Sequence, residues 1–314
     1  QAYFSYSTTS SSGITPKHDY LKNNFTFKQS TKFFNDKVKV TSNVILSNEN
    51  TSNRNRAGHY NNPLTGLYWF PRERDINEFK TNYSTFNVDR NVDVMNWFVS
   101  DHHQSNPYWL LNSESQEDRF KRAIANLTAE WDINEQFKFQ TRFNIDYADK
   151  EYDERRRAGG NTTTVAKNGR WIYSDYTDTK SYLDGILSYT NTFGEDFTVN
   201  ALAGATYQRT KYGDGVAVNS DMEDTGLLYA NEFNFQNLGP TVQVRSTLSN
   251  NVEKQSLFAN FELGYKDMLF LDFAGRNDWA STLAETGNES YFYPSVGVSA
   301  IASQMFEMPD WISF

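Results

Sequence analysis

The chain has 314 residues, a formal net charge of −9, a pI near 5.1 and no cysteine. The lack of cysteine excludes a disulfide framework, a thiolate metal site and a cysteine nucleophile. Its 30 lysines and arginines are scattered rather than gathered in one stretch, so a nucleic-acid surface is not expected.

The aromatic content is high for so polar a chain. Phe, Trp and Tyr make up 16% of the residues, although the mean hydropathy is −0.71. The sequence has no run of eighteen or more apolar residues, so it has no transmembrane helix. A membrane role would therefore require β-strands, in which only alternate residues face lipid.

Apolar and polar residues alternate along much of the chain, which is typical of strands with one wet face. Several of the predicted strands exceed the ~9–11 residues that a strand needs to cross a bilayer, so we expect them to extend beyond it. Ten strands are predicted in chain order: 1–9, 18–33, 37–50, 116–132, 136–152, 170–192, 197–211, 246–265, 268–282 and 291–302.

The hairpin from Ala123 to Tyr147 shows the pattern most clearly. One face is apolar, with Ala123, Ala125, Leu127, Ala129, Trp131, Phe137, Phe139, Phe143, Ile145 and Tyr147. The other is polar, with Arg122, Asn126, Thr128, Glu130, Lys138, Gln140, Arg142, Asn144 and Asp146.

Two kinds of connection join the predicted strands. Four are tight turns flanked by aromatic residues, at Asn35-Asp36, Asn134-Glu135, Gly194-Glu195-Asp196 and Lys266-Asp267. The others are long and polar, at 9–17, 50–116, 153–169, 212–246 and 282–290. Short turns with an aromatic girdle on one side and long loops on the other indicate an outer-membrane barrel, with periplasmic turns and extracellular loops.

The segment 50–116 is too long for an ordinary connection and is predicted to be a functional extracellular loop. It holds a candidate short helix near Arg74 to Lys80 and five large aromatic residues. These rings have two open interpretations: they stack on sugar rings, or they pack the loop onto its neighbours or a partner. The ligand-binding candidates are Tyr68, Trp69, Trp97, Tyr108 and Trp109.

Other polar groups do not form an expected active site. His102-His103, with His18 and His59, lack the spacing of metal ligands. The run Arg155-Arg156-Arg157 follows three acidic residues, which favours internal ion pairs over binding to lipopolysaccharide phosphates. Asp221, Glu223 and Asp224 lack the glycine and distal glutamate of a calcium loop. We therefore expect no catalytic residue, no metal and no cofactor.

Two late segments, Arg276–Leu283 and Tyr291–Ser299, resemble the late-barrel signature of SusC/RagA-like TonB-dependent transporters of Bacteroidota. Asn106-Pro107-Tyr108-Trp109 and Gly13-Ile14-Thr15-Pro16 support this resemblance, which covers essentially the whole chain. It implies an all-β fold: about ten antiparallel strands of a 22-stranded transmembrane β-barrel. Residues 1–314 would be a partial TonB-dependent receptor barrel without its plug domain and last strands.

The resemblance also implies a function and partners. The expected function is import of oligosaccharides or peptides across the bacterial outer membrane. The expected partners are a SusD-like surface lipoprotein, the TonB complex acting through the plug, and outer-membrane lipid and lipopolysaccharide. A passive porin or an adhesin barrel is the alternative. A secreted glycan-active enzyme is a third hypothesis, weakened by the lack of a catalytic carboxylate pair.

Overall fold

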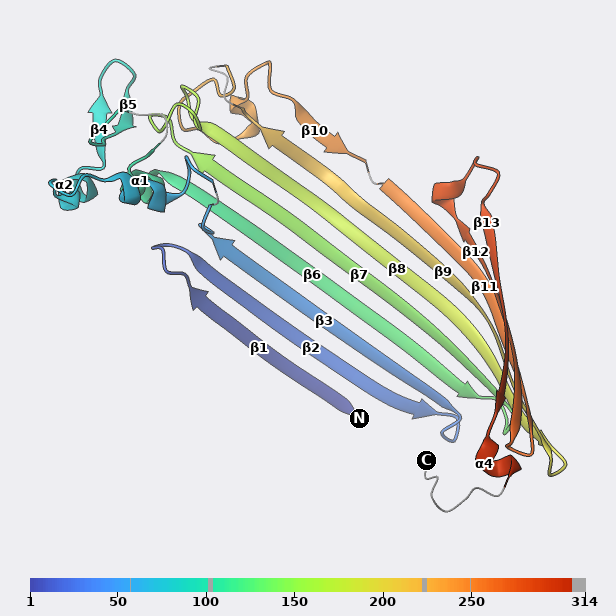
Figure 1. Cartoon of the computed structure of the whole chain (residues 1–314). Coiled ribbons are helices and arrows are strands. Elements are labelled where there is room, and N and C mark those ends of the chain that lie inside the picture. The colour runs from blue at the N-terminus through green and yellow to red at the C-terminus, as the bar shows by residue number, and fades with distance from the viewer. Residues whose placement is uncertain (57, 101–103, 222–224, 249, 307–314) are drawn as a thin grey trace.

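The computed structural model describes residues 1–314 except 57, 101–103, 222–224, 249 and 307–314. Figure 1 shows one large sheet of long strands lying side by side, with long loops and short helices near one end of the strands and tight turns and the last short helix near the other. The sheet is twisted and curved, since β1 to β9 are seen face-on in Figure 1 whereas β12 and β13 are seen edge-on.

Ten long strands form the sheet, and each pairs antiparallel with its neighbour. They are β1 (Ala2–Ser12), β2 (Asp19–Phe33), β3 (Val38–Ser52), β6 (Glu114–Asp132), β7 (Phe137–Arg156), β8 (Arg170–Phe193), β9 (Phe197–Asn219), β11 (Asn250–Tyr265), β12 (Leu269–Ala280) and β13 (Ser290–Ala300). The short β10 (Val244–Thr247) pairs with β9. Within the described residues, β1 and β13 are the two edges of an open arc.

The ten predicted strands and the antiparallel fold class are confirmed, with strand ends that differ by a few residues in most cases. The largest difference is at β9, which continues to Asn219 beyond the predicted end at 211. Gly213-Asp214-Gly215 suggests a loop in the sequence, but it lies beside a bulge between Thr177 and Thr179 of β8. Gly213 has a φ of +68° and donates its N–H to the Asp178 carboxylate at 2.8 Å.

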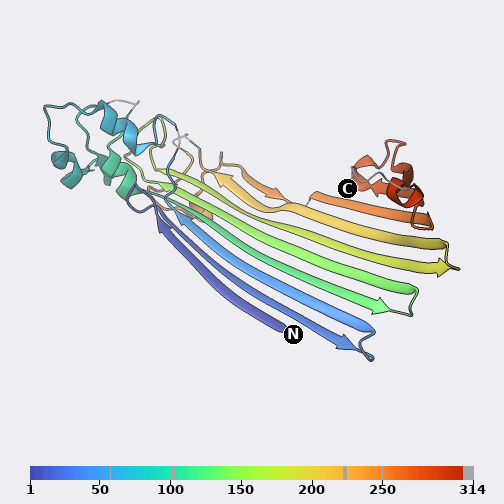
Figure 2. The same cartoon turned by 60° about the horizontal axis from the view of Figure 1, so that its bottom comes forward.

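The segment 53–113 between β3 and β6 contains small elements of its own, including the predicted helix near 74–80. These elements are α1 (Pro63–Trp69), α2 (Ile76–Thr81), β4 (Ser84–Asn87), β5 (Val92–Met95) and α3 (Pro107–Ser113). Two 3₁₀ turns, η1 (Phe235–Asn237) and η2 (Ser281–Leu283), and a short helix α4 (Ala302–Met305) complete the fold. Figure 2 shows the helices of segment 53–113 beyond the ends of the strands.

No helix in the described part of the chain is long and apolar enough to cross a membrane.

The register gives the sheet one apolar and one polar face. Ser42, Leu127, Phe143, Leu183 and Tyr207 lie in one cross-strand row of the apolar face, which we call the outer face. Polar pairs cross the strands on the opposite, inner face. The Arg122 guanidinium donates to both carboxylate oxygens of Asp146 at 2.8 and 2.6 Å, and Asn200 Nδ2 donates to Glu262 at 2.8 Å. This alternation is what a wall between lipid and water requires.

The apolar part of the outer face ends sharply at both sides. On β7 it runs from Phe137 to Tyr147, matching the ~9–11 residues that a tilted strand needs to cross hydrocarbon. Beyond Tyr147 the next outward residue is Asp149, which lies opposite Lys121. At the other limit, aromatic side chains flank the tight turns: Phe33, Trp131, Phe137, Tyr189, Phe193, Phe197 and Tyr265.

We predict that an arginine is tolerated differently on the two faces of β9. In lipid bilayers, Ala201→Arg should lower the free energy of unfolding by about 2–4 kcal/mol, because Ala201 lies inside the apolar part of the outer face. Asn200→Arg, the adjacent control, places the charge on the inner face opposite Glu262 and should cost much less. Denaturant titration in lipid bilayers measures both, and an equal cost would contradict the assignment of the faces.

Candidate functional site

The candidate site is the loop assembly, defined as the described residues of 53–113, 157–169 and 220–243, at the end of the sheet opposite the tight turns (Figure 1). Backbone contacts join its three segments. Met95 donates its N–H to the Gly159 carbonyl at 2.8 Å, and Asn231 donates its N–H to the Asn168 carbonyl at 3.0 Å. Gly159 has a φ of +90°, and a Cβ there would lie 2.1 Å from the Asp93 carbonyl oxygen. The close approach of β5 therefore requires glycine at this position.

Among the described residues of segment 53–113, Asn106 is the most buried polar residue, with an exposed fraction of 0%. Its Oδ1 accepts the N–H of Tyr108 at 2.9 Å and so caps the start of α3. Its Nδ2 donates to the carbonyl of Phe79 at 3.1 Å and to that of Asn96 at 2.7 Å. One amide therefore ties α3 to α2 and to the residues that follow β5.

Two more buried asparagines hold the other two segments. Asn161 Nδ2 donates to the Gln104 carbonyl and to Ser105 Oγ, both at 3.3 Å. Asn237 Nδ2 donates to the carbonyls of Tyr229 and Glu232 at 2.8 and 2.6 Å. Each amide satisfies backbone groups that burial would otherwise leave without partners. These polar contacts add to the apolar side chains buried in the loop assembly, among them Phe79, Trp109 and Leu227.

An ion-pair cluster lies where the loop assembly meets the sheet. Glu114 and Arg156 are direct cross-strand neighbours of β6 and β7, and Arg56 comes from the loop after β3. Arg156 binds Glu154 at 2.7 Å, and Arg56 binds Glu154 at 3.2 Å and also pairs with Glu114. Two carboxylates and two guanidinium groups thus balance in charge, and the Tyr152 hydroxyl donates to Glu154 at 2.6 Å.

Burial and ion pairing act in opposite directions in this cluster. Burial raises the pKa of Glu114 more than Arg56 and Arg156 lower it. Burial also opposes ionisation of Glu154, but Arg56, Arg156 and the Tyr152 hydroxyl together hold its pKa below the ordinary value. Burial raises the pKa of Tyr152, which keeps its hydroxyl protonated as a donor. Glu154 is therefore the carboxylate that the two arginines stabilise.

The five predicted ligand-binding residues fall into two groups. Trp109 is 1% exposed, and Trp97 packs against Phe70 and Phe79 with ring centroids 5.3 and 5.2 Å apart. Tyr108 is partly buried, with Lys80 Nζ 5.9 Å from its ring centroid. Tyr68 and Trp69, at the end of α1, are 84% and 55% exposed. A ligand-binding role remains a prediction for all five, and only Tyr68 and Trp69 present mostly open rings.

The other polar candidates are placed as follows. Arg155 and Arg156 pair with Asp153 and Glu154 in their own strand, at 2.6 and 2.7 Å. They lie in β7 and not in a loop, because β7 continues to Arg156. His102, His103, Glu223 and Asp224 lie outside the described residues. Within the residues that the structure describes, no three His, Cys, Asp or Glu side chains form a group able to hold a metal ion.

Sequence reasoning expected ion pairs for the Arg155-Arg156-Arg157 run, but it missed Arg56 and Glu114 as members of the cluster and the starts of two helices. Asn62-Pro63 and Asn106-Pro107 both place asparagine at the N-cap and proline at the first helical position, a recognisable helix start. The ion-pair cluster had a weaker signal. Glu114 and Arg156 become neighbours only once the register of β6 and β7 is fixed.

Comparisons with known proteins agree with this architecture, although no family model matches the chain. The TonB-dependent receptor P26 of Formosa agariphila is 26% identical over 118 residues, which are 37% of this chain and 11% of that receptor. A solved structure of the RagAB peptide transporter covers 95% of this chain with a TM-score of 0.67 and 17% identity. The RagAB peptide importer in its open-open state gives a TM-score of 0.62, 16% identity and 95% coverage.

The chain spans about a third of the solved RagAB chains, since the matched parts are 32% and 31% of their lengths. Its sheet, turns and loops have the architecture of part of the β-barrel of a TonB-dependent receptor. Among such barrels it is similar to that of the RagAB transporter, so the resemblance to SusC/RagA-like transporters is confirmed at the level of the fold.

We predict that Asn106→Ala loosens the loop assembly without unfolding the sheet. The change removes an N-cap and leaves two buried carbonyls without their donor, a local cost of about 1–3 kcal/mol. Limited proteolysis of the complete protein should then show faster cleavage within 53–113. Asn112→Ala is the control, because Asn112 lies exposed in the same helix, where it donates to the Tyr108 carbonyl and accepts from Lys17 Nζ, both at 2.8 Å. Equal cleavage of both variants would contradict the role of Asn106.

We also predict a pH-dependent contribution from Glu154. Its pKa is lowered on folding, so the stabilisation is fully present above the unfolded value of about 4.3 and is lost as the pH falls through the folded pKa. Glu154→Gln should cost about 3 kcal/mol at pH 7, because it breaks buried ion pairs to two arginines. Calorimetric unfolding from pH 7 to pH 3 measures this effect. The difference in unfolding temperature between Glu154→Gln and the unaltered protein should shrink at acid pH.

Glu117→Gln is the matched control for that experiment. Glu117 is a carboxylate of β6 that is 41% exposed and pairs with Arg119 on the outer face beyond the apolar band. The Glu117→Gln substitution should change the unfolding temperature little at any pH. A Glu154→Gln effect that is the same at pH 7 and pH 3 would contradict the ion-pair account.

Proposed function

We propose that this chain is part of the wall and loop cap of a TonB-dependent transporter in the bacterial outer membrane. The observation that carries this proposal is the two-faced register, with an outer apolar band that ends at aromatic residues on one side and at charged residues on the other. In lipid every backbone polar group needs a partner, which a paired antiparallel sheet provides. The similarity to RagAB and to a TonB-dependent receptor supports the same function.

The proposed cargo is an oligosaccharide or a peptide. The solved relative is a peptide transporter by its description, which favours peptides, whereas the SusC-like resemblance favours glycans. The loop assembly presents hydrogen-bonding side chains and exposed rings to either ligand. A SusD-like lipoprotein over the loops, the TonB complex acting through a plug domain, and outer-membrane lipid and lipopolysaccharide around the wall are the proposed partners.

Uptake measurements test this function. Cells that carry the complete protein should take up a labelled oligosaccharide or peptide mixture, and loss of TonB should reduce that uptake to the level of cells without the protein. Uptake that continues unchanged without TonB would indicate a passive porin instead. Surface adhesion without any uptake would indicate an adhesin barrel. Comparing the two mixtures also separates glycan cargo from peptide cargo.

Tyr68 and Trp69 are the residues through which we expect the loop assembly to contact cargo. Replacing both with Ala should raise the cargo concentration needed for half-maximal uptake by about tenfold. The reason is the loss of two aromatic contacts of about 0.5–1.5 kcal/mol each. Phe86→Ala is the control, because Phe86 is 60% exposed on β4 of the same loop assembly. An equal effect of Phe86→Ala, or no effect of the double substitution, would contradict the proposal that Tyr68 and Trp69 contact cargo.

A further inference from the structure

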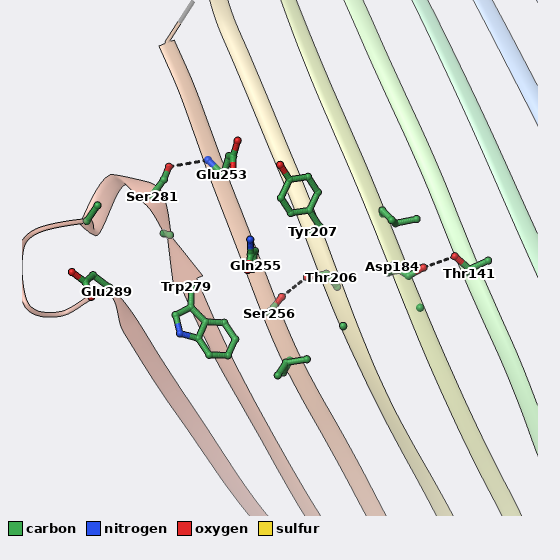
Figure 3. A pocket seen from close by; sticks show the side chains of 16 residues that line it. Thr141, Asp184, Thr206, Tyr207, Glu253, Gln255, Ser256, Trp279, Ser281 and Glu289 are labelled. Atoms are coloured by element: carbon green, nitrogen blue, oxygen red, sulfur yellow. Dashed lines mark hydrogen bonds between the residues drawn. The ribbon is translucent and has the colours of Figure 1, made fainter.

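One hollow of the sheet faces outward and another faces inward. Figure 3 shows the first, on the outer face, where Gln255 lies between the rings of Tyr207 and Trp279. In the proposed membrane placement this hollow faces lipid, so it is not open to cargo. The second has a volume of about 590 Å³ and lies near the loop end of β8, β9 and β10. This volume falls in the range of about 300–1,000 Å³ that is usual for ligand sites.

The register places the second hollow, which we call the inner pocket, on the inner face. Ile172 of β8 is the cross-strand partner of Glu154, which points to the same side of β7 as Asp146. The same alternation continues through β9 and β10. The inward-facing strand residues of the lining are Ile172, Ser174, Ala217, Asn219 and Arg245. The inner pocket therefore opens toward the lumen of the proposed barrel, at the end where cargo enters.

The inner pocket carries one uncompensated positive charge. Arg245 is exposed, and its side chain has no ion pair or hydrogen bond within the part of the chain that the structure describes. The other charges beside the pocket are balanced. Burial lowers the pKa of Arg170, and the nearby carboxylate of Asp221 acts in the opposite direction, which places these two opposite charges close together. Glu154 is paired with both arginines of the ion-pair cluster.

Several polar groups of the lining are available as donors. Asn219 Oδ1 accepts the N–H of Asp221 at 3.0 Å and Arg170 Nε at 3.3 Å, whereas its Nδ2 has no acceptor among the described residues. The side chains of Ser174 and Gln243 make no hydrogen bond to any described residue either. A guanidinium surrounded by amide and hydroxyl donors is suited to a carboxylate, which only accepts.

The distance between Arg245 and Asn219 allows one carboxylate to reach both. Arg245 lies opposite Ala217 on β9, two residues from Asn219 in the same strand, and all three face inward. Such diagonal neighbours are about 7–8 Å apart, which is within reach of a long side chain. The two donors therefore converge on the space above Ala217.

The apolar part of the lining favours a peptide over an acidic sugar. Ile172 and Ala217 are aliphatic and can contact the side chain of an amino acid. Tyr173 is the one aromatic residue among the described residues of the lining, but its ring packs against Trp171 and Phe235, at centroid distances of 5.4 and 5.8 Å. Because Tyr173 faces outward, a sugar ring finds no aromatic face to stack on in the described lining.

We propose that the inner pocket binds the C-terminal carboxylate of a peptide cargo. The carboxylate accepts hydrogen bonds from the Arg245 guanidinium and from Asn219 Nδ2, and the last side chain of the peptide lies over Ile172 and Ala217. The inference rests on the proposed function, because the inner face lies on a cargo path only in a transport barrel. It adds the chemical group by which cargo is recognised.

Binding of labelled peptides to the purified complete protein tests the proposal. The probe is a mixture of pentapeptides without Asp or Glu, labelled at the N-terminus, with either a free C-terminal carboxylate or a C-terminal amide. We expect amidation to weaken binding about tenfold in fluorescence anisotropy, because the amide lacks the charge that Arg245 binds. Equal affinity of the two mixtures would overturn the proposal.

Three variants locate the binding. Arg245→Gln should make the two mixtures bind equally, and the exposed side chain makes loss of folding unexpected. Arg209→Gln is the matched control, since it removes an arginine from the outer face of β9 and should leave the preference unchanged. Ala217→Leu fills the floor of the inner pocket and should weaken binding of the carboxylate mixture. A preference that survives Arg245→Gln, or that Arg209→Gln removes equally, would overturn the site.

These binding measurements need no TonB, so they separate this inference from the proposed function. Peptides that bind without a carboxylate preference, together with TonB-dependent uptake, would leave the transporter standing and refute the inner pocket. A preference that depends on Arg245, together with uptake that ignores TonB, would support the inner pocket and refute the transporter. If oligogalacturonate binds through Arg245 and neither peptide mixture binds, the ligand is an acidic glycan and the peptide assignment is wrong.

Discussion

The pairing of backbone N–H and C=O groups between neighbouring strands is the interaction on which the whole structure depends. In hydrocarbon no water replaces a missing partner, so each strand must be paired along its membrane-crossing length. Because side chains alternate between faces with a period of two, one register then fixes the environment of every residue. The row through Phe143, Leu183 and Tyr207 faces outward, and Arg142 and Asp184 face inward, as a direct consequence.

The loop assembly combines buried apolar side chains, such as Phe79, Val92 and Trp109, with buried polar contacts. Asn106 and Asn161 bind backbone groups distant in the sequence, and Asn237 binds two carbonyls within its own segment. The cluster of Arg56, Glu114, Glu154 and Arg156 joins these loops to the end of the sheet through buried charges. Such networks fix one geometry because a partly satisfied network is costly. A rigid loop assembly of this kind is suited to presenting Tyr68 and Trp69 at its surface.

The strands were predictable from the sequence and the loop assembly was not, for a physical reason. In the membrane-crossing part, Phe139 faces lipid and Gln140 faces water. The alternation of apolar and polar residues in the sequence therefore shows which face of the sheet each residue occupies. Beyond it both faces meet water, and the extension of β9 past Gly213 leaves no alternation to detect. The contacts of Asn106 and Glu154 depend on partners far along the chain, which local patterns do not encode. The helix near 74–80 was predicted, whereas the helix starts at Asn62-Pro63 and Asn106-Pro107 carry a local signal that sequence reasoning missed.

The most direct test of the account is a nitroxide scan along β9 from Val199 to Tyr207 in the complete protein, reconstituted in bilayers. The accessibility of each label to oxygen, which partitions into lipid, is compared with its accessibility to a water-soluble nickel complex. We predict a period of two, with labels at Val199, Ala201, Ala203 and Ala205 accessible to oxygen and the labels between them accessible to nickel. Accessibility that does not alternate, or that alternates in the opposite phase, would contradict the account.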